Sequence, residues 1–206
     1  MTGLLRINAP RAALPIAITP VLTALARRYP DLIVEITSDD ALTDIVAGGF
    51  DAGVRLGGMI AQDMVVIRLT PPFKAILVAA PSYIDAKEEP KTIDDLARHN
   101  CIGFRVPASG AIYAWDLTQA GEDMTVAVKG TMLVPIRPAG AGIAYIFEPL
   151  VRAEIRQRRL RWILPEAAVE EPGLFLYYRR RASNAPKLRA FIDIAREVLA
   201  PSARPA

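Results

Sequence analysis

The chain has 206 residues, 52% of them hydrophobic and 23% charged, which is enough apolar material for the core of one domain or of two small ones. Its 25 basic and 22 acidic side chains leave a formal charge of only +3, and this balance does not by itself indicate a nucleic-acid partner. The single cysteine, Cys101, excludes an intramolecular disulfide, so a reducing cytoplasm is the expected location.

The first residues argue against export and membrane insertion. Pro10, Pro15 and Pro20 interrupt the apolar residues where a signal peptide would have an unbroken apolar core. No uncharged apolar stretch reaches the ~18 residues that a membrane-spanning helix needs. We therefore expect a cytoplasmic protein without a membrane partner.

Strands and helices alternate over the first part of the chain. Residues 4–9 alternate apolar and polar side chains as a strand does, and residues 14–28 carry apolar side chains at helical spacing. Residues 32–38 and 50–57 are predicted strands, with a helix over residues 41–49 between them. Such strand–helix–strand units imply right-handed crossovers and a parallel sheet covered on both faces.

The carboxyl ends of these three strands are the expected ligand-binding edge. In open α/β sheets, ligands bind beyond the carboxyl ends of the strands. Those ends lie at residues 8–13, 37–40 and 55–58.

The rest of the chain contains shorter elements. From residue 101 to 134 local strand pairing dominates, and the chain ends in an amphipathic helix over 184–200 and a tail expected to be disordered. Further strands are predicted over 65–70, 73–80, 101–106, 112–118, 124–130, 131–134, 159–164 and 173–178, short helices over 81–87 and 92–99, and a strand passing into a helix over 141–155.

The order of elements predicts two lobes. The chain crosses from the first lobe near residues 73–78 and returns near 163–171. We expect a first lobe of residues 1–75 plus 168–206 and a second of residues 76–167. Two crossings of this kind form a hinge that can close around a ligand.

Several stretches follow one another in a specific order. GLLRINAPRAALPIAITPVLTALARRYPDLIVEI is followed by DIVAGGFDAGVRLG and QDMVVIRL, and then by PSYI, DDLARHNCIGFR, GIAYIFEPLV and FLYYRRR. Together they resemble the effector-binding domain of LysR-type transcriptional regulators over essentially the whole chain. The resemblance implies a two-lobed, periplasmic-binding-protein-like α/β fold with mixed, mainly parallel sheets and a two-strand hinge. It also implies a homodimer or tetramer that senses a small organic effector, such as a carboxylate or an aromatic acid, in the cleft between the lobes.

Members of that family read operator DNA through a winged helix-turn-helix that precedes this domain. These residues contain no helix-turn-helix pattern and no basic recognition helix. We expect operator binding only through a domain absent from this sequence, and we interpret Met1 as an artificial start. The arginines within residues 152–161 and 179–181 are expected to be solvated or to contact a partner domain.

Two departures from the family concern the effector site. After residues 131–134 only PIRPAGA precedes the next strand, about a dozen residues short of the helix that lines the cleft in relatives. Ala12 stands where relatives commonly carry a serine or threonine that can hydrogen-bond an effector carboxylate.

The candidate ligand residues of the first lobe follow its strands. The turn of Arg11, Ala12 and Ala13 begins a helix and is a natural anion site, unless Arg11 is merely solvated. Arg55, Leu56 and Gly57 end the third strand, where the glycine would let a ligand approach the backbone. Asp39, which follows the second strand, is a further candidate ligand contact, with a helix-capping role as its alternative. For Arg55 the alternative is an ion pair with Asp39 or Asp51.

The second lobe offers aromatic and basic candidates. Phe104 and Arg105 follow one predicted strand, and Tyr145 and Phe147 lie on another. They could contact the ligand from the other side, although aromatic side chains at this spacing usually belong to the core.

Residues for catalysis, metal binding or cofactor binding are few. His99 and Cys101 could form a dyad only if both side chains faced one way, and a structural histidine with a buried cysteine is the default. One histidine and one cysteine cannot supply a zinc site, and no phosphate-binding glycine motif is present. We expect no enzyme activity, no metal and no cofactor.

Three functions therefore remain open from the sequence. We favour a sensing domain that dimerises through its first lobe, with the helix over residues 14–25 against the strand over 32–37. The alternatives are a transport-type solute-binding protein of the same architecture and a dimerisation module without a competent pocket.

Overall fold

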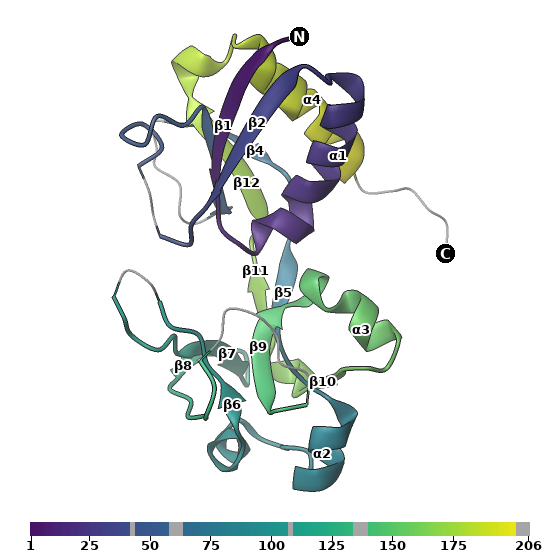
Figure 1. Cartoon of the computed structure of the whole chain (residues 1–206). Coiled ribbons are helices and arrows are strands. Elements are labelled where there is room, and N and C mark those ends of the chain that lie inside the picture. The colour runs from purple at the N-terminus through teal and green to yellow at the C-terminus, as the bar shows by residue number, and fades with distance from the viewer. Residues whose placement is uncertain (42–43, 58–63, 107–108, 134–139, 201–206) are drawn as a thin grey trace. The chain divides into compact units, whose positions relative to one another are not determined.

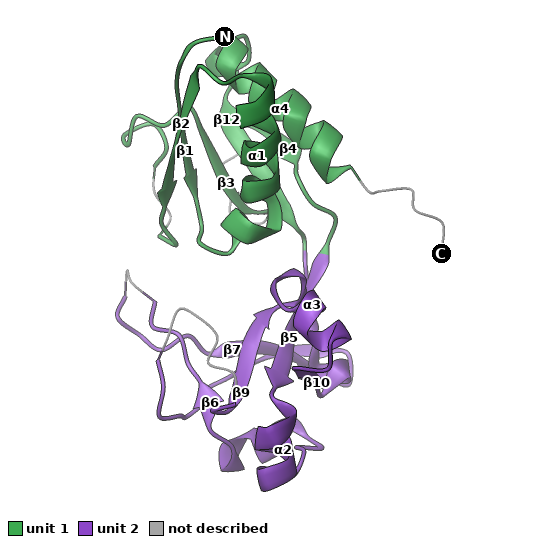
Figure 2. Ribbon diagram, turned by 45° about the vertical axis from the view of Figure 1, so that its right-hand side comes forward, with its two compact units in different colours: residues 1–72, 172–206 green, residues 73–171 purple. Residues whose placement is uncertain are grey.

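A computed structural model describes residues 1–41, 44–57, 64–106, 109–133 and 140–200. The chain forms two compact units, Met1–Pro72 with Pro172–Ala206 and Phe73–Glu171 (Figure 2). The predicted boundaries between the lobes, after residues 75 and 167, lie within a few residues of this division. The assignment of these units as lobes stays a prediction. Phe73 pairs with Glu171 across two antiparallel strands, so the two crossings of the chain lie side by side.

Unit 1 contains a five-stranded sheet in the order β2-β1-β3-β12-β4 (Figure 1). Strands β1 (Gly3–Ala9), β2 (Leu32–Ser38) and β3 (Ala52–Leu56) run parallel, as the strand–helix pattern predicts. Strands β12 (Leu174–Arg179) and β4 (Met64–Arg68) complete the sheet in antiparallel pairings. The expected mixed sheets are therefore confirmed, but the expectation of mainly parallel pairing is wrong, because three of the described strand pairs are parallel and six are antiparallel.

Two helices pack together in unit 1. Helix α1 (Thr19–Arg28) follows the π-helical turn η1 (Leu14–Ile18), and α4 (Pro186–Leu199) brings the end of the chain back against α1. Both helices are amphipathic and bury their apolar residues. The buried side chains of the two helices are Val21, Leu25, Leu188, Ala190, Phe191, Ile192, Ile194 and Ala195.

The predicted helix over residues 41–49 is wrong for the part of it that the structure describes. Residues 45–49 form hydrogen-bonded turns instead. The Asp44 carboxylate accepts the Val46 backbone N–H at 2.7 Å, and this local bond competes with helix formation. The Gly48 and Gly49 carbonyls then accept hydrogen bonds from the Arg6 guanidinium at 3.3 and 3.2 Å, which ties the segment to β1.

Unit 2 is built around β5 (Phe73–Ala79) in a sheet ordered β10-β5-β9-β6, with β11 (Val169–Glu171) also paired to β5. Only β6 (Cys101–Ile102) with β9 (Ile143–Phe147) is a parallel pair among the described strands of this unit. A hairpin of β7 (Trp115–Gln119) and β8 (Glu122–Val126) packs beside them. The remaining elements are β10 (Arg161–Ile163), α2 (Pro81–Lys87), α3 (Arg152–Arg156) and the short 3-10 turns η3 (Ile93–Arg98), η4 (Glu148–Leu150) and η5 (Pro165–Ala167), with η6 (Arg180–Ala182) in unit 1.

Some predicted strands of unit 2 are shorter than expected. Strand β6 ends at Ile102, beyond which Gly103 and Arg105 form only isolated bridges. Leu133 forms one such bridge instead of a strand over 131–134, and β11 has no counterpart among the sequence predictions. The short connection at residues 134–139 and the predicted disordered tail lie outside the described residues.

Candidate functional site

The carboxyl ends of β1, β2 and β3 meet at one edge of the unit 1 sheet. The register pairs Ala9 with Ser38 and Asn8 with Gly53, so the three parallel strands end close together. This is the edge at which open α/β sheets bind ligands. Strand geometry thus brings the residues after β1 and β2 next to Arg55 near the end of β3.

Arg55 is buried at this edge, with 3% of its surface exposed. Its guanidinium donates hydrogen bonds to the Asn8 Oδ1 at 2.5 Å, to the Val54 carbonyl at 2.7 Å and to the Ala41 carbonyl at 2.8 Å. Asn8 itself is only 1% exposed. The Arg55 Nε and the Asn8 Nδ2 are both buried and have no hydrogen-bond acceptor among the described residues.

No described carboxylate forms an ion pair with Arg55, which leaves a buried positive charge held by neutral oxygens. Neither of the two ion pairs expected as alternatives, with Asp39 or with Asp51, is formed among the described residues. Asp51 pairs with Lys187 at 2.7 Å, and the Asp39 carboxylate caps the Ala41 N–H at 2.9 Å. Burying an uncompensated charge costs on the order of several kcal/mol. An anionic group at this place would offset that cost.

The turn after β1 is occupied by a carboxylate of the chain itself. Asp40 accepts the Arg11 backbone N–H at 2.9 Å and the Arg11 Nε at 2.7 Å. The Ala13 and Leu14 N–H groups bond to the Pro10 and Arg11 carbonyls. Arg11 is exposed, with 44% of its side-chain surface accessible, and pairs with Asp40, so its role in ligand binding stays a prediction.

Gly57 was expected to leave room for a ligand beside the backbone, but the Phe175 side chain occupies the space next to it. A Cβ atom built on Gly57 would lie 2.6 Å from the Phe175 ring, so the aromatic side chain and not a ligand takes that volume. Leu56 lies opposite Leu174 in the β3–β12 pair. Of the three predicted residues at the end of this strand, Arg55 is therefore the one with a buried donor that lacks an acceptor among the described residues.

In unit 2, Tyr145 on β9 lies in a stack of aromatic rings. Its ring centroid is 6.4 Å from that of Tyr113 and 5.9 Å from that of Trp115, with both ring pairs nearly parallel. The Tyr145 hydroxyl is buried and has no hydrogen-bond partner in the described part of the chain. Burial, followed by the nearby Tyr113 and the carboxylates of Glu171 and Asp116, raises the pKa of Tyr145.

The other predicted residues of unit 2 have structural contacts. Phe147 packs edge-on against Phe73 with 5.3 Å between ring centroids, and the Phe104 carbonyl accepts the Tyr113 N–H at 2.8 Å. Arg105 is exposed and bonds to the Gly110 carbonyl. Within its own unit, each of these residues has a local partner.

Sequence reasoning missed several residues of these clusters. Asn8 was predicted only as part of a strand end, although an amide between the apolar Ile7 and Ala9 is a usable signal for a buried polar group. Asp116 and Glu171 gave no signal, because their proximity to Tyr145 depends on tertiary folding. Asp116 accepts hydrogen bonds from the Tyr113 hydroxyl at 2.6 Å and the Thr125 hydroxyl at 3.0 Å.

Glu171 makes the stability of the domain depend on pH. Burial, with the nearby Asp116 carboxylate adding to it, raises the Glu171 pKa above its ordinary value of 4.5. The folded state therefore binds this proton more tightly than the unfolded state, and stability is lost as the pH rises from 4.5 through the raised pKa. Glu171→Gln should increase the free energy of unfolding at pH 7 and give no gain below pH 4.5.

Urea unfolding followed by circular dichroism across this pH range measures the effect. The neighbouring Glu170→Gln, at an exposed position, is the matched control and should show no such crossover. A gain for Glu171→Gln that is equal at every pH would contradict the assignment to this carboxyl group.

The His99 and Cys101 side chains do not form a dyad. The His99 Nδ1 lies 3.3 Å from the Tyr83 hydroxyl, and the Cys101 thiol donates to the Leu96 carbonyl at 3.6 Å. Burial raises the pKa of the Cys101 thiol to about 11, so the thiol is protonated at neutral pH and is a poor nucleophile. Burial is also the main cause that lowers the pKa of His99.

Neither a metal cluster nor a membrane span is found in the described residues. Among them, no group of three or more histidine, cysteine, aspartate or glutamate side chains could hold a metal ion. No helix within the same residues is long and apolar enough to cross a bilayer.

Comparison with protein families identifies the family of the chain. The model of the LysR substrate binding domain matches residues 1–200. The chain belongs to the LysR substrate-binding domain family. The resemblance and the two-lobed α/β fold expected from it are thereby confirmed.

Relatives of this LysR domain are named as transcriptional regulators. The "Uncharacterized HTH-type transcriptional regulator YcaN" of Escherichia coli (strain K12) is 37% identical over 93% of this chain and 65% of its own length. A "Putative transcriptional regulator" of Pseudomonas aeruginosa is 37% identical over 86% of this chain and 60% of its own length. The chain therefore spans less than two thirds of these two relatives.

Solved structures of LysR regulatory domains share the fold. The CrgA regulatory domain from Neisseria meningitidis superposes with a TM-score of 0.79 at 19% identity, over 97% of this chain and all of that one. The regulatory domain of AphB in Vibrio vulnificus gives a TM-score of 0.77 at 22% identity, over 95% and 98%.

Proposed function

We propose that this LysR domain senses a small organic anion, such as a carboxylate or an aromatic acid, through Arg55 and Asn8. The observation that carries the proposal is the buried Arg55 guanidinium, which has no carboxylate partner among the described residues and leaves its Nε without an acceptor. Charge-assisted bonds from a guanidinium to a carboxylate are among the stronger hydrogen bonds in proteins. The ligand would thus supply the negative charge that the Arg55 guanidinium lacks among the described residues.

Sensing in this proposal serves transcription control in the cytoplasm, without catalysis. The relatives are named as transcriptional regulators, and the protonated, buried Cys101 offers no nucleophile to His99. Operator DNA would be bound by a DNA-binding domain outside these residues. Phe104, Arg105, Tyr145 and Phe147 remain proposed as ligand contacts from unit 2.

Dimerisation through unit 1 is the second part of the proposal. Ile33 on β2 is 66% exposed, and β2 is an edge strand of its sheet. An edge strand with an exposed apolar side chain is a ready surface for a second copy. Helix α1 of one copy against β2 of the other would cover it.

A dimerisation module without a competent pocket is the second candidate, and Asp40 is the observation in its favour. Its carboxylate already occupies the Arg11 donors. An internal carboxylate of this kind would compete with an effector at the turn after β1.

A thermal-shift screen of small carboxylates and aromatic acids tests the two candidates. A ligand that binds only the folded state raises the Tm as the ligand concentration increases. At a hundredfold excess over Kd, such a ligand adds about 2.7 kcal/mol to the free energy of unfolding. The neutral amides of the same compounds at equal ionic strength are the controls. No rise for any acid, together with a dimer in analytical ultracentrifugation, would replace sensing with the dimerisation module.

A further inference from the structure

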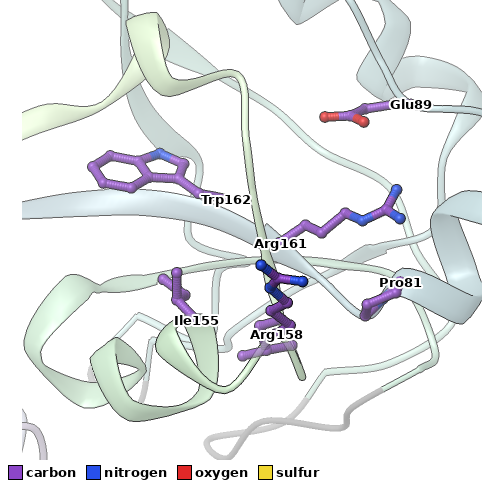
Figure 3. Close-up of a pocket in the computed structure, with 7 residues that line it drawn as sticks. Pro81, Glu89, Ile155, Arg158, Arg161 and Trp162 are labelled. Carbon is purple, nitrogen blue, oxygen red and sulfur yellow. The ribbon is translucent and has the colours of Figure 1, made fainter.

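A pocket lies within unit 2, at the edge strand β10 (Figure 3). Its volume is about 510 Å³, within the range of small-molecule sites. Apolar side chains of Ile155, Leu160 and Trp162 line it together with the charged side chains of Glu89, Arg158 and Arg161.

The apolar wall is part of a packed cluster. Ile155, Leu160 and Trp162 pack against the buried Ile76 and Val78 of β5. The Trp162 indole N–H is buried and finds no hydrogen-bond acceptor in the described chain. A flat, fixed aromatic surface of this kind favours an apolar ligand body.

Arg158 is held in place by the turn that ends α3. Its φ of 56° is left-handed, a conformation that costs a residue other than glycine roughly 1–2 kcal/mol. Its N–H bonds to the Ile155 carbonyl at 3.0 Å, and the next N–H, of Arg159, bonds to the Glu154 carbonyl at 2.8 Å. The Arg158 guanidinium has no hydrogen bond or ion pair with any described residue.

Arg161 provides a second guanidinium at the pocket. Its ion pair with Asp85 is long, at 3.4 Å, and both side chains are about half exposed. Exposed pairs of this kind contribute little and are easily exchanged for another anion. With Asp85 paired to Arg161, Arg158 is the lining arginine that has no anionic partner among the described residues.

We propose that this pocket binds a small apolar carboxylate, at a site separate from Arg55. The carboxylate pairs with Arg158 and Arg161, and the apolar body lies against Trp162, Leu160 and Ile155. Glu89 opposes the ligand charge and limits its affinity. The site lies within unit 2 and does not depend on the sensing role of Arg55.

The test uses the full 206-residue chain, labelled with ¹⁵N, and 2-naphthoate as the probe. The chain has two tryptophans, so the indole region shows two resonances, and Trp162→Phe assigns one of them. The Trp162 resonance should shift saturably, with half-saturation at about 1 mM for a ligand of this size. The neutral 2-naphthamide should shift it far less.

Three variants check the assignment. Arg158→Gln should weaken binding at least about threefold, whereas Glu89→Gln should strengthen it because a like charge is removed. Arg55→Gln should leave the Trp162 shift unchanged, which separates this site from the proposed sensing site. An equal shift with the amide, or no shift at ten times the expected half-saturation, would overturn the proposal.

Discussion

Arg55→Gln is expected to abolish the stabilisation of the domain by small carboxylates. The guanidinium is the positive charge at the strand-end edge, and hydrogen bonds to charged groups are worth about 1.5–3 kcal/mol each. Loss of the hydrogen bonds from the guanidinium should lower the affinity for a carboxylate ligand by roughly tenfold or more. Isothermal titration of the variant with an acid that stabilises the wild type measures this loss.

The control for Arg55→Gln is Arg27→Gln, which removes an exposed arginine from α1 of the same unit. It should bind as the wild type does. If both variants lose affinity equally, the arginine at the strand end has no special role and long-range charge accounts for binding.

Asn8→Asp tests the same site, and here we expect a more stable free domain that no longer responds to acids. The substitution is nearly isosteric and places a carboxylate at the Oδ1 position that accepts a hydrogen bond from the Arg55 Nη2 at 2.5 Å. An internal ion pair should raise the Tm of the free domain, because it neutralises the buried charge. The same carboxylate should compete with the ligand and remove the response to added acids.

The strand-end rule led from the sequence to Arg55, but it could not predict what surrounds it. The alternating apolar and polar residues over 4–9 and the strand–helix–strand order that follows them predict parallel strands from local pattern alone. Two of the three acceptors of Arg55 lie far away in the sequence, namely Asn8, 47 residues earlier, and the Ala41 carbonyl. Such contacts depend on tertiary packing, for which neither periodicity nor propensity carries information.

Arg11 and Asp40 show the same limit at the neighbouring turn. A helix start with an arginine predicts an anion site, and the structure does place a carboxylate there. That carboxylate is the chain's own, from 29 residues further along. The chemistry was predictable from the residue types, whereas the identity of the anion was not.

Asn100 organises the chain on either side of the short connection in unit 2. Its Oδ1 accepts the Thr131 N–H at 2.7 Å, and its Nδ2 donates to the Ala141 carbonyl at 2.6 Å. Its own carbonyl accepts the Ile143 N–H at 2.9 Å. One side chain therefore fixes the segments before and after residues 134–139 to the start of β6.

Gly142→Ala is expected to be strongly destabilising at this junction. A Cβ at residue 142 would lie 2.0 Å from the Asn100 carbonyl oxygen and 3.0 Å from its carbon. The obstacle is backbone, so it cannot be relieved by turning a side chain, and the Ile143 hydrogen bond to the same oxygen would be displaced. We expect a loss of about 3 kcal/mol or more in the free energy of unfolding, above the usual cost of overpacking.

Gly140→Ala is the matched control two residues away. A Cβ there meets nothing within 4 Å, and the φ of 89° leaves only conformational strain, worth about 1 kcal/mol. Chemical denaturation of both variants should therefore separate steric from conformational cost at nearly the same place in the chain. Equal losses would mean that the carbonyl of Asn100 can move, and that the junction is less tightly fixed than its hydrogen bonds imply.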